Sequence, residues 1–154
     1  MLYKEKHRSF LGRETNNMKW ITWENVGVDR IACAWLIKKF IDPKAEFEFI
    51  KKGADLKGAE GIPFDIPGVT LSHKRGRCTF CTILKEYDHI NDPVLNQICD
   101  IVDAADALND VLPPPEAAGL EVIFRGLRKV VEDDRKALEV GYIVMESLYK
   151  QLSE

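Results

Sequence analysis

The residues best suited to chemistry in this sequence lie in one short segment, from His73 to Cys81. Cys78 and Cys81 have Cys-x-x-Cys spacing, which lets two sulfur atoms converge on one metal ion or on each other. His73 can reach the same point across a loop that contains Gly76. Imidazole and thiolate groups suit zinc, iron and other transition metals. We therefore expect a zinc or iron site held by His73, Cys78 and Cys81, with Asp106 completing the ligand set.

Two other interpretations of the cysteine pair stay open. Cys78 precedes a predicted helix, Thr79 to Tyr87, and a helix N-terminus lowers the pKa of a thiol, so the pair can be redox-active. Both thiols can instead be buried as small apolar side chains. Cys33 and Cys99 lie in apolar helical patterns, which favours core packing for both. Four cysteines in 154 residues are too few for a disulfide framework, so we expect reduced thiols in the cytoplasm.

Positive charges near this segment predict a site for a small inorganic anion. Some lie in the loop before Cys78, and others lie on a predicted helix from Asp29 to Ile41, about 80° apart around its axis. A solvated charged face is the alternative for the loop cations. The expected oxyanion-binding residues are Arg30, Lys38, Arg75 and Arg77.

Several aspartates are candidates for weaker roles. Asp103, Asp106 and Asp110 follow i, i+3, i+7 spacing, so they either face solvent together or share a cation. Asp29 suits a helix N-cap, and Asp65 suits a turn in which its side chain bonds local backbone amides.

The first half of the chain alternates strand and helix patterns. A β-prone segment after Met18, the alternating segment Ala45 to Ile50, and Val69 to Ser72 predict three short strands. The helix from Asp29 to Ile41 lies between the first two strands. It ends at Asp42-Pro43, because a residue before proline avoids the helical conformation.

The second half is predicted to be helical. Asp92-Pro93 begins one helix, Pro113 to Pro115 separates it from the next, and a last helix begins near Glu132. The fold class is therefore α+β, with a small sheet of about three strands and a helix-dominated C-terminal half. We expect one domain, residues 18–154, after a disordered arm, residues 1–17.

Composition excludes several functions. The net charge of -3 provides no broad basic face, so we do not expect nucleic-acid binding by this domain alone. No apolar run is long enough to cross a membrane, and the N-terminus is not a secretory signal, so we expect a cytoplasmic protein without a membrane partner.

Leu138, Met145 and Leu152 recur every seven residues, which favours a helix docked on the core and leaves a homodimer as the alternative.

The segment Val28 to Ile37, Val-Asp-Arg-Ile-Ala-Cys-Ala-Trp-Leu-Ile, resembles the signature of the chromate-resistance family, specifically the C-terminal domain of ChrB-type proteins. Similar motifs follow at Pro63 to Gly68, Pro115 to Leu120 and Leu138 to Tyr142. The resemblance covers about residues 19 to 152.

The resemblance also shows departures. The family usually carries a carboxylate where Cys81 stands, arginine where Asp103 stands, proline at Ala34 and arginines at Lys38 and Lys39. What it implies is a part in bacterial chromate resistance, where longer relatives add an N-terminal domain that helps control a chromate efflux transporter. We therefore expect a metal- or oxyanion-binding sensor or accessory domain. The alternative is a metal- or thiol-dependent enzyme acting on a small oxyanion or another small substrate.

Overall fold

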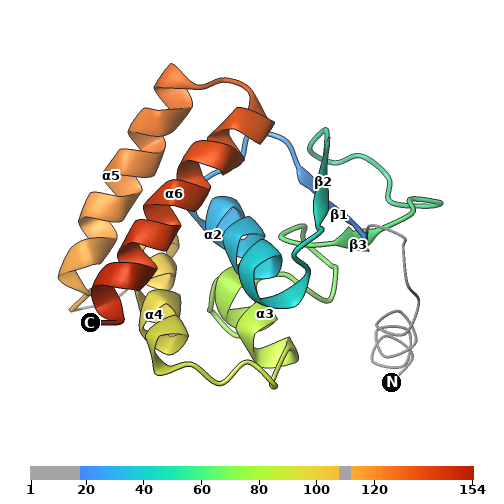
Figure 1. Cartoon of the computed structure of the whole chain (residues 1–154). Coiled ribbons are helices and arrows are strands. Elements are labelled where there is room, and N and C mark those ends of the chain that lie inside the picture. Colours follow the sequence, from blue (N-terminus) through green and yellow to red (C-terminus); the bar gives the residue numbers. More distant parts are fainter. Residues whose placement is uncertain (1–17, 108–111) are drawn as a thin grey trace.

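The computed structural model of the chain describes residues 18–107 and 112–154. The expected arm, residues 1–17, and Asp110 lie outside these ranges. The described residues form a three-stranded parallel sheet and a set of helices that dominates the second half of the chain (Figure 1). This confirms the α+β fold class.

The sheet has the strand order β2-β1-β3, so β1 is central. Its strands are β1 (Lys19–Trp23), β2 (Glu46–Ile50) and β3 (Ile62–Pro63). The parallel register pairs Trp20 of β1 with Phe47 on one side and with Ile62 on the other. The first two strands are thus confirmed where the sequence predicts them.

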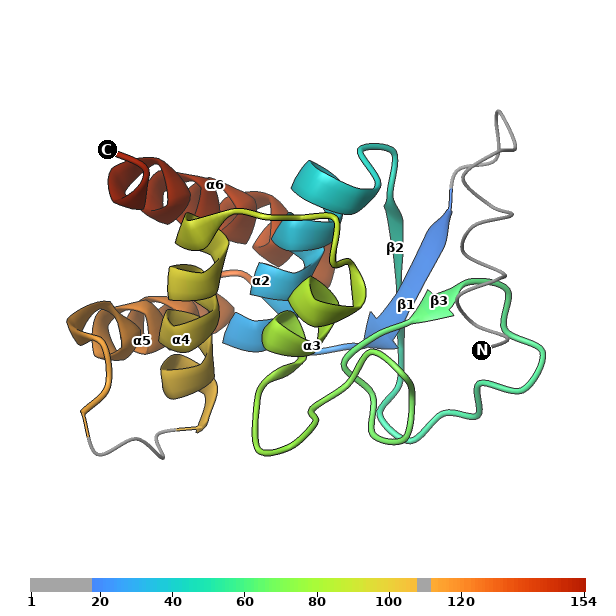
Figure 2. The ribbon, with the colours of Figure 1, turned by 90° about the horizontal axis from the view of Figure 1, so that it is seen from below.

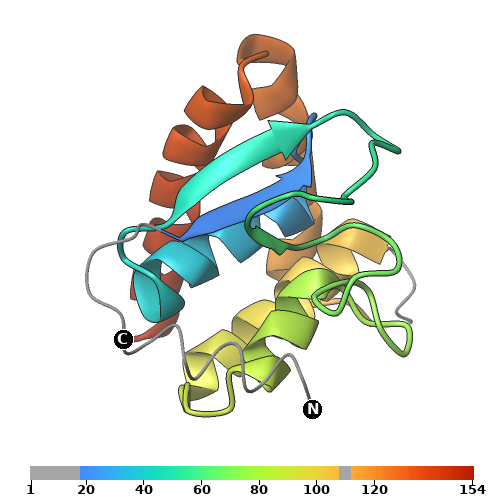
Figure 3. The ribbon, with the colours of Figure 1, turned by 90° about the vertical axis from the view of Figure 1, so that its right-hand side faces the viewer.

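The helices lie on one face of the sheet (Figure 3). α2 packs between the sheet and a pair of long helices, α5 and α6, while α3 and α4 lie beside it (Figures 1 and 2). Their bounds are α2 (Val28–Leu36), the π-helical turn η1 (Ile37–Ile41), α3 (Thr79–Glu86), α4 (Pro93–Ala107), α5 (Pro115–Val130) and α6 (Asp134–Leu152). Among the described residues, no helix combines the length and the apolar character needed to cross a membrane.

The third strand is not the one that the sequence predicts. The segment Val69 to Ser72 forms no strand, and within it only Leu71 makes a single bridge, to Phe64. The third strand of the sheet is β3, which comes earlier in the chain. β3 lies at the edge of the sheet, where a proline is tolerated because the side away from β1 has no ladder. The chain enters β3 through Gly61, whose φ of 154° and close approach to the Lys19 carbonyl oxygen leave no room for a side chain.

Aromatic packing fixes α2 and α3 beneath the sheet. Trp35 of α2 is buried and stacks on Phe80 of α3 with a ring separation of 6.4 Å and an interplanar angle of 9°. On the other side, α6 approaches α2 closely because Gly141 faces Ile31 with no side chain between them. These contacts fix α2 against α3 and α6, and α4 packs against both α2 and α3. The polar residues described next lie at the ends of α2, α3 and α4.

Candidate metal centre

Three carboxylates from separate parts of the chain meet around one imidazole. This His73 cluster comprises Asp29 of α2, Asp65 after β3, His73 before α3, and Asp106 of α4. His73 Nε2 lies 2.8 Å from Asp106 Oδ2 and 3.6 Å from Asp29 Oδ2. Its other ring nitrogen, Nδ1, lies 3.3 Å from Asp65 Oδ1. The cluster borders a cavity of about 550 Å³, so its open side can admit a small ligand.

Asp29 is fixed by the N-terminus of α3. Its Oδ2 accepts a 2.9 Å hydrogen bond from the backbone N–H of Thr79, and its Oδ1 accepts one of 3.0 Å from Phe80. These are N–H groups of the first helical turn, which has no intrahelical acceptor for them. Asp29 therefore caps α3 from α2, whereas the sequence suggested a cap on its own helix, which begins after Gly27 without a side-chain cap.

Asp65 is held by two partners. Its carboxylate forms a 3.0 Å ion pair with Arg30 Nε and accepts a 2.6 Å hydrogen bond from the Thr79 hydroxyl. Arg30 Nη2 also donates to the Asp65 backbone carbonyl oxygen at 2.9 Å. Asp65 has a positive φ of 51°, which is a costly backbone conformation for a residue other than glycine. The ion pair and the hydroxyl hydrogen bond together hold the turn in this conformation.

The cluster has an excess of carboxylates. Burial, and then the charges of Asp65 and Asp106, raises the pKa of Asp29 to about 7, although two backbone N–H groups favour its ionised form. Burial likewise raises the pKa of Asp65 despite the hydroxyl of Thr79. For His73, burial opposes the charged ring, but the hydrogen bond to Asp106 and the surrounding carboxylates raise its pKa above the usual value. A bound cation relieves this charge excess.

The geometry of the cluster fits a metal ion. Asp29, His73 and Asp106 each offer one ligand atom, and these atoms lie within 4.8 Å of one another. Two carboxylates and one imidazole are ligands for zinc, iron and manganese. Asp29 is buried, whereas His73 and Asp106 are exposed to the cavity side, so a metal there keeps positions open for water or another ligand.

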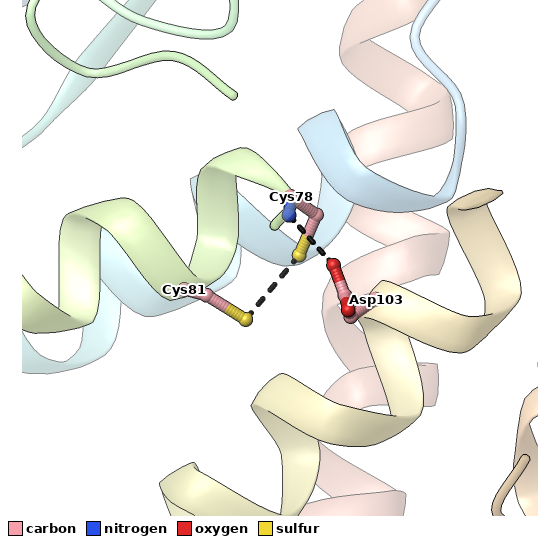
Figure 4. Close-up of side chains that lie close together, drawn as sticks. All are labelled: Cys78, Cys81 and Asp103. Carbon is pink, nitrogen blue, oxygen red and sulfur yellow. Dashed lines mark hydrogen bonds between the residues drawn. The ribbon is translucent and has the colours of Figure 1, made fainter. Parts of the chain in front are cut away.

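A second group of side chains, the cysteine cluster, comprises Cys78, Cys81, Cys99 and Asp103. The Cys78 and Cys81 sulfur atoms lie 3.5 Å apart, and Asp103 Oδ1 accepts a 2.7 Å hydrogen bond from the Cys78 backbone N–H (Figure 4). Ligand atoms of Cys78, Cys81 and Asp103 also lie within 4.8 Å of one another. The His73 cluster and the cysteine cluster share no residue. The four residues expected to bind one metal ion are therefore divided between them, with His73 and Asp106 in the first and Cys78 and Cys81 in the second.

The expectation of reduced thiols is wrong for one pair. Cys81 of α3 and Cys99 of α4 form a disulfide with a Cα–Cα distance of 5.2 Å. Cys33 and Cys78 are free and buried, as core packing requires. Burial and the charge of Asp29 raise the pKa of Cys78, which disfavours the alternative in which the helix N-terminus activates this thiol.

The four expected oxyanion-binding residues do not form one site. Arg30 borders the cavity of the His73 cluster, and Lys38 borders a different cavity between β2 and α6. Arg75 and Arg77 border a third cavity, of about 800 Å³. Arg77 is anchored there by a 2.8 Å ion pair with Asp100, and its Nη2 lies 3.0 Å from Cys99 Sγ.

Sequence reasoning missed Asp29 and Asp65 as members of the site. Both are buried polar residues, and nothing in a local pattern distinguishes them from ordinary caps and turn residues. Asp103 was visible in the acidic spacing of α4, but its hydrogen bond to Cys78 depends on how α3 packs against α4. The motifs that carry the family resemblance were a useful signal, because Asp29 lies in Val28 to Ile37 and Asp65 lies in Pro63 to Gly68.

Comparisons with known proteins identify one family and one relative that are similar to most of this chain. Residues 20–152 match the family described as ChrB, C-terminal domain. Protein ChrB of Cupriavidus metallidurans is 34% identical over 136 residues, which are 88% of this chain and 41% of that protein. This chain thus spans about two-fifths of the length of that relative. No solved structure matches the chain significantly.

Proposed function

This chain belongs to the ChrB C-terminal-domain family, and on that premise we propose that it is a cytoplasmic metal-binding sensor or accessory domain in bacterial chromate resistance. Asp29, His73 and Asp106 are its metal ligands, and zinc or iron is the metal. One observation carries the proposal: three ligand atoms from α2, from the loop before α3 and from α4 converge within 4.8 Å beside a cavity.

Charge supports a cation at this place. Among the described residues, the Arg30 guanidinium and the His73 ring are the positive groups that form ion pairs with Asp29, Asp65 and Asp106. A buried carboxylate without full compensation is costly, and its raised pKa is the sign of that cost. A divalent ion stabilises all three carboxylates in their ionised form. It binds the neutral imidazole, so binding releases protons.

The surroundings support a ligand-responsive site. A metal held by three protein ligands accepts an additional small ligand, and Arg30 borders the same cavity, so a bound anion also meets a positive charge. Metal or anion binding joins α2, α3 and α4, because Asp29 contacts both the metal position and the first turn of α3. This linkage provides the means by which a sensor responds to its ligand.

An enzyme is the second candidate, and the same open coordination positions favour it. A metal with three protein ligands can activate water or polarise a substrate. The two functions differ in turnover: an enzyme converts a small substrate and loses that activity when the metal is removed, whereas a binding domain does neither.

The proposal is tested by elemental analysis of protein that is purified without added metal and with the Cys81–Cys99 disulfide intact. We expect about one equivalent of zinc or iron per chain, removed by a chelator and absent from the His73→Ala variant. The His89→Ala variant, which removes an exposed histidine outside the cluster, is the matched control and keeps its metal. Equal metal content in the two histidine variants, or none in the parent even after incubation with zinc and iron, contradicts the proposal.

A further inference from the structure

Cys81 takes part in two arrangements that exclude each other. Its sulfur is bonded to Cys99, and it also lies 3.5 Å from the Cys78 sulfur within the group formed with Asp103. A metal ligand must be a thiolate, and a sulfur atom in a disulfide carries no such charge. The bond to Cys99 therefore removes one ligand from a group that otherwise has metal-binding geometry.

We propose that reduction of the Cys81–Cys99 disulfide opens a second metal site, formed by Cys78, Cys81 and Asp103, and that oxidation closes it. Two thiolates and one carboxylate select a softer ion than the His73 cluster does, such as cadmium. The inference goes beyond the proposed function, because it concerns other residues and another class of metal.

The three residues are already placed for ligation. All are buried, and the two sulfur atoms come from the first turn of α3 and the residue before it (Figure 4). Asp103 is oriented by the backbone N–H of Cys78 on one oxygen and by Arg77 Nε, 3.4 Å away, on the other. Only the Cys81 sulfur has to change its bonding partner.

The surroundings of Cys99 suit the reduced state. Arg77 Nη2 lies 3.0 Å from Cys99 Sγ, against 3.4 Å from Cys81 Sγ, so the guanidinium offers a countercharge to a Cys99 thiolate. Asp100 holds this guanidinium in place. Cys81 and Cys99 both border the cavity of about 800 Å³, which gives a small dithiol or peroxide access to the bond.

The redox step is a thiol–disulfide exchange with a dithiol reductant. One thiolate of the reductant attacks Cys99 Sγ, the Cys81–Cys99 bond breaks, and Cys81 leaves as a thiolate. The second thiol of the reductant then breaks the mixed disulfide. Two electrons and two protons pass to the cysteines, and the reductant becomes a disulfide. In the reverse direction a peroxide, ROOH, takes both electrons and both protons and yields ROH and water. Metal binding to the reduced protein displaces the protons of Cys78 and Cys81.

The test uses the full chain and Cd²⁺, because cadmium–thiolate bonds give an ultraviolet charge-transfer band that carboxylate and imidazole ligands do not. We expect the band in parent protein reduced by a dithiol that is then removed, and its loss after peroxide treatment. The Cys99→Ser variant, which cannot form the disulfide, shows the band before and after peroxide. The Cys81→Ser variant lacks it in both states.

Two controls separate this inference from its alternatives. Cys33→Ala leaves the redox-dependent band unchanged, because this buried thiol lies outside the cysteine cluster. His73→Ala also leaves it unchanged, so failure of the site at the His73 cluster does not affect this result. An equal band in oxidised parent overturns the inference. So does its absence from reduced parent and from Cys99→Ser protein that circular dichroism shows to be folded.

Discussion

Asp29 Oδ2 accepts a 2.9 Å hydrogen bond from the backbone N–H of Thr79, so one carboxylate both caps α3 and borders the position proposed for a metal. The same residue has a pKa raised to about 7, mainly because it is buried. Stability and ligand binding are therefore coupled at Asp29, and pH is the simplest way to observe this coupling.

The stability of the metal-free protein should fall as pH rises from about 4 to about 7. Asp29 binds a proton more tightly in the folded state than in the unfolded one, so folding is favoured at low pH. His73 acts in the same direction, because its raised pKa contributes stability that is lost as pH increases through the folded value. A difference of one pKa unit between the folded and unfolded states changes the free energy of unfolding by about 1.4 kcal/mol. At the low end of this pH range, protonation of other carboxylates destabilises the fold and opposes the trend.

Denaturant titration between pH 5 and pH 8 measures this slope. We expect Asp29→Asn to reduce the slope and metal to flatten it, since a cation stabilises the ionised carboxylates. A parent protein that gains stability over the same range would show that Asp29 is ionised without cost.

Adding a methyl group to Gly141 should weaken the docking of α6. A Cβ atom there would clash with Ile31 of α2, and overpacking of this kind typically costs about 1–3 kcal/mol. Gly126→Ala on α5 is the matched control, because nothing lies within 4 Å of the added atom, and alanine there is neutral or stabilising by up to about 1 kcal/mol. Equal effects of the two substitutions on the free energy of unfolding would disprove the close approach.

Replacing Trp35 with alanine should destabilise the protein by about 3–5 kcal/mol, because it removes a fully buried ring. It also leaves Glu146 without the indole N–H that donates to it at 2.9 Å. Val122→Ala, at an exposed position of α5, is the control and should change stability by less than about 0.5 kcal/mol. An unfolding midpoint of Trp35→Ala near the parental value would be incompatible with this core.

Reduction of the Cys81–Cys99 disulfide should lower the free energy of unfolding by about 3 kcal/mol, since the bond closes a loop between residues 18 positions apart. The Cys99→Ser variant should show the lower stability with or without reductant. A parent protein whose denaturation curve does not respond to a dithiol would mean that the bond contributes nothing to stability.

Local patterns predicted most of the fold, because the alternation in β2 and the caps and prolines of the helices act over a few residues. The third strand was misplaced because β3 is an edge strand of two residues, shorter than any periodic signal. The pairing of Cys81 with Cys99 was not predictable, because it depends on the packing of α3 against α4.

The candidate site was likewise predictable in its residue types and not in its grouping, which depends on tertiary packing. The sequence indicated His73 and Asp106, since their residue types suggest ligation wherever they occur. It grouped His73 with Cys78 and Cys81, because the three residues lie close together along the chain, and added Asp106 to complete the ligand set. The structure separates the two groups, because the ligand atoms of His73 and Asp106 lie near Asp29 of α2, whereas those of Cys78 and Cys81 lie near Asp103.

Isothermal titration calorimetry of the metal-free, disulfide-intact protein with Zn²⁺ is the most direct test of a metal site at the His73 cluster. In this state Cys81 is bonded to Cys99, so the cysteine cluster does not contribute a complete ligand set. We expect one site per chain, retained in His89→Ala and lost in both His73→Ala and Asp106→Asn. Zinc binding of parental affinity in folded His73→Ala and Asp106→Asn proteins would contradict it.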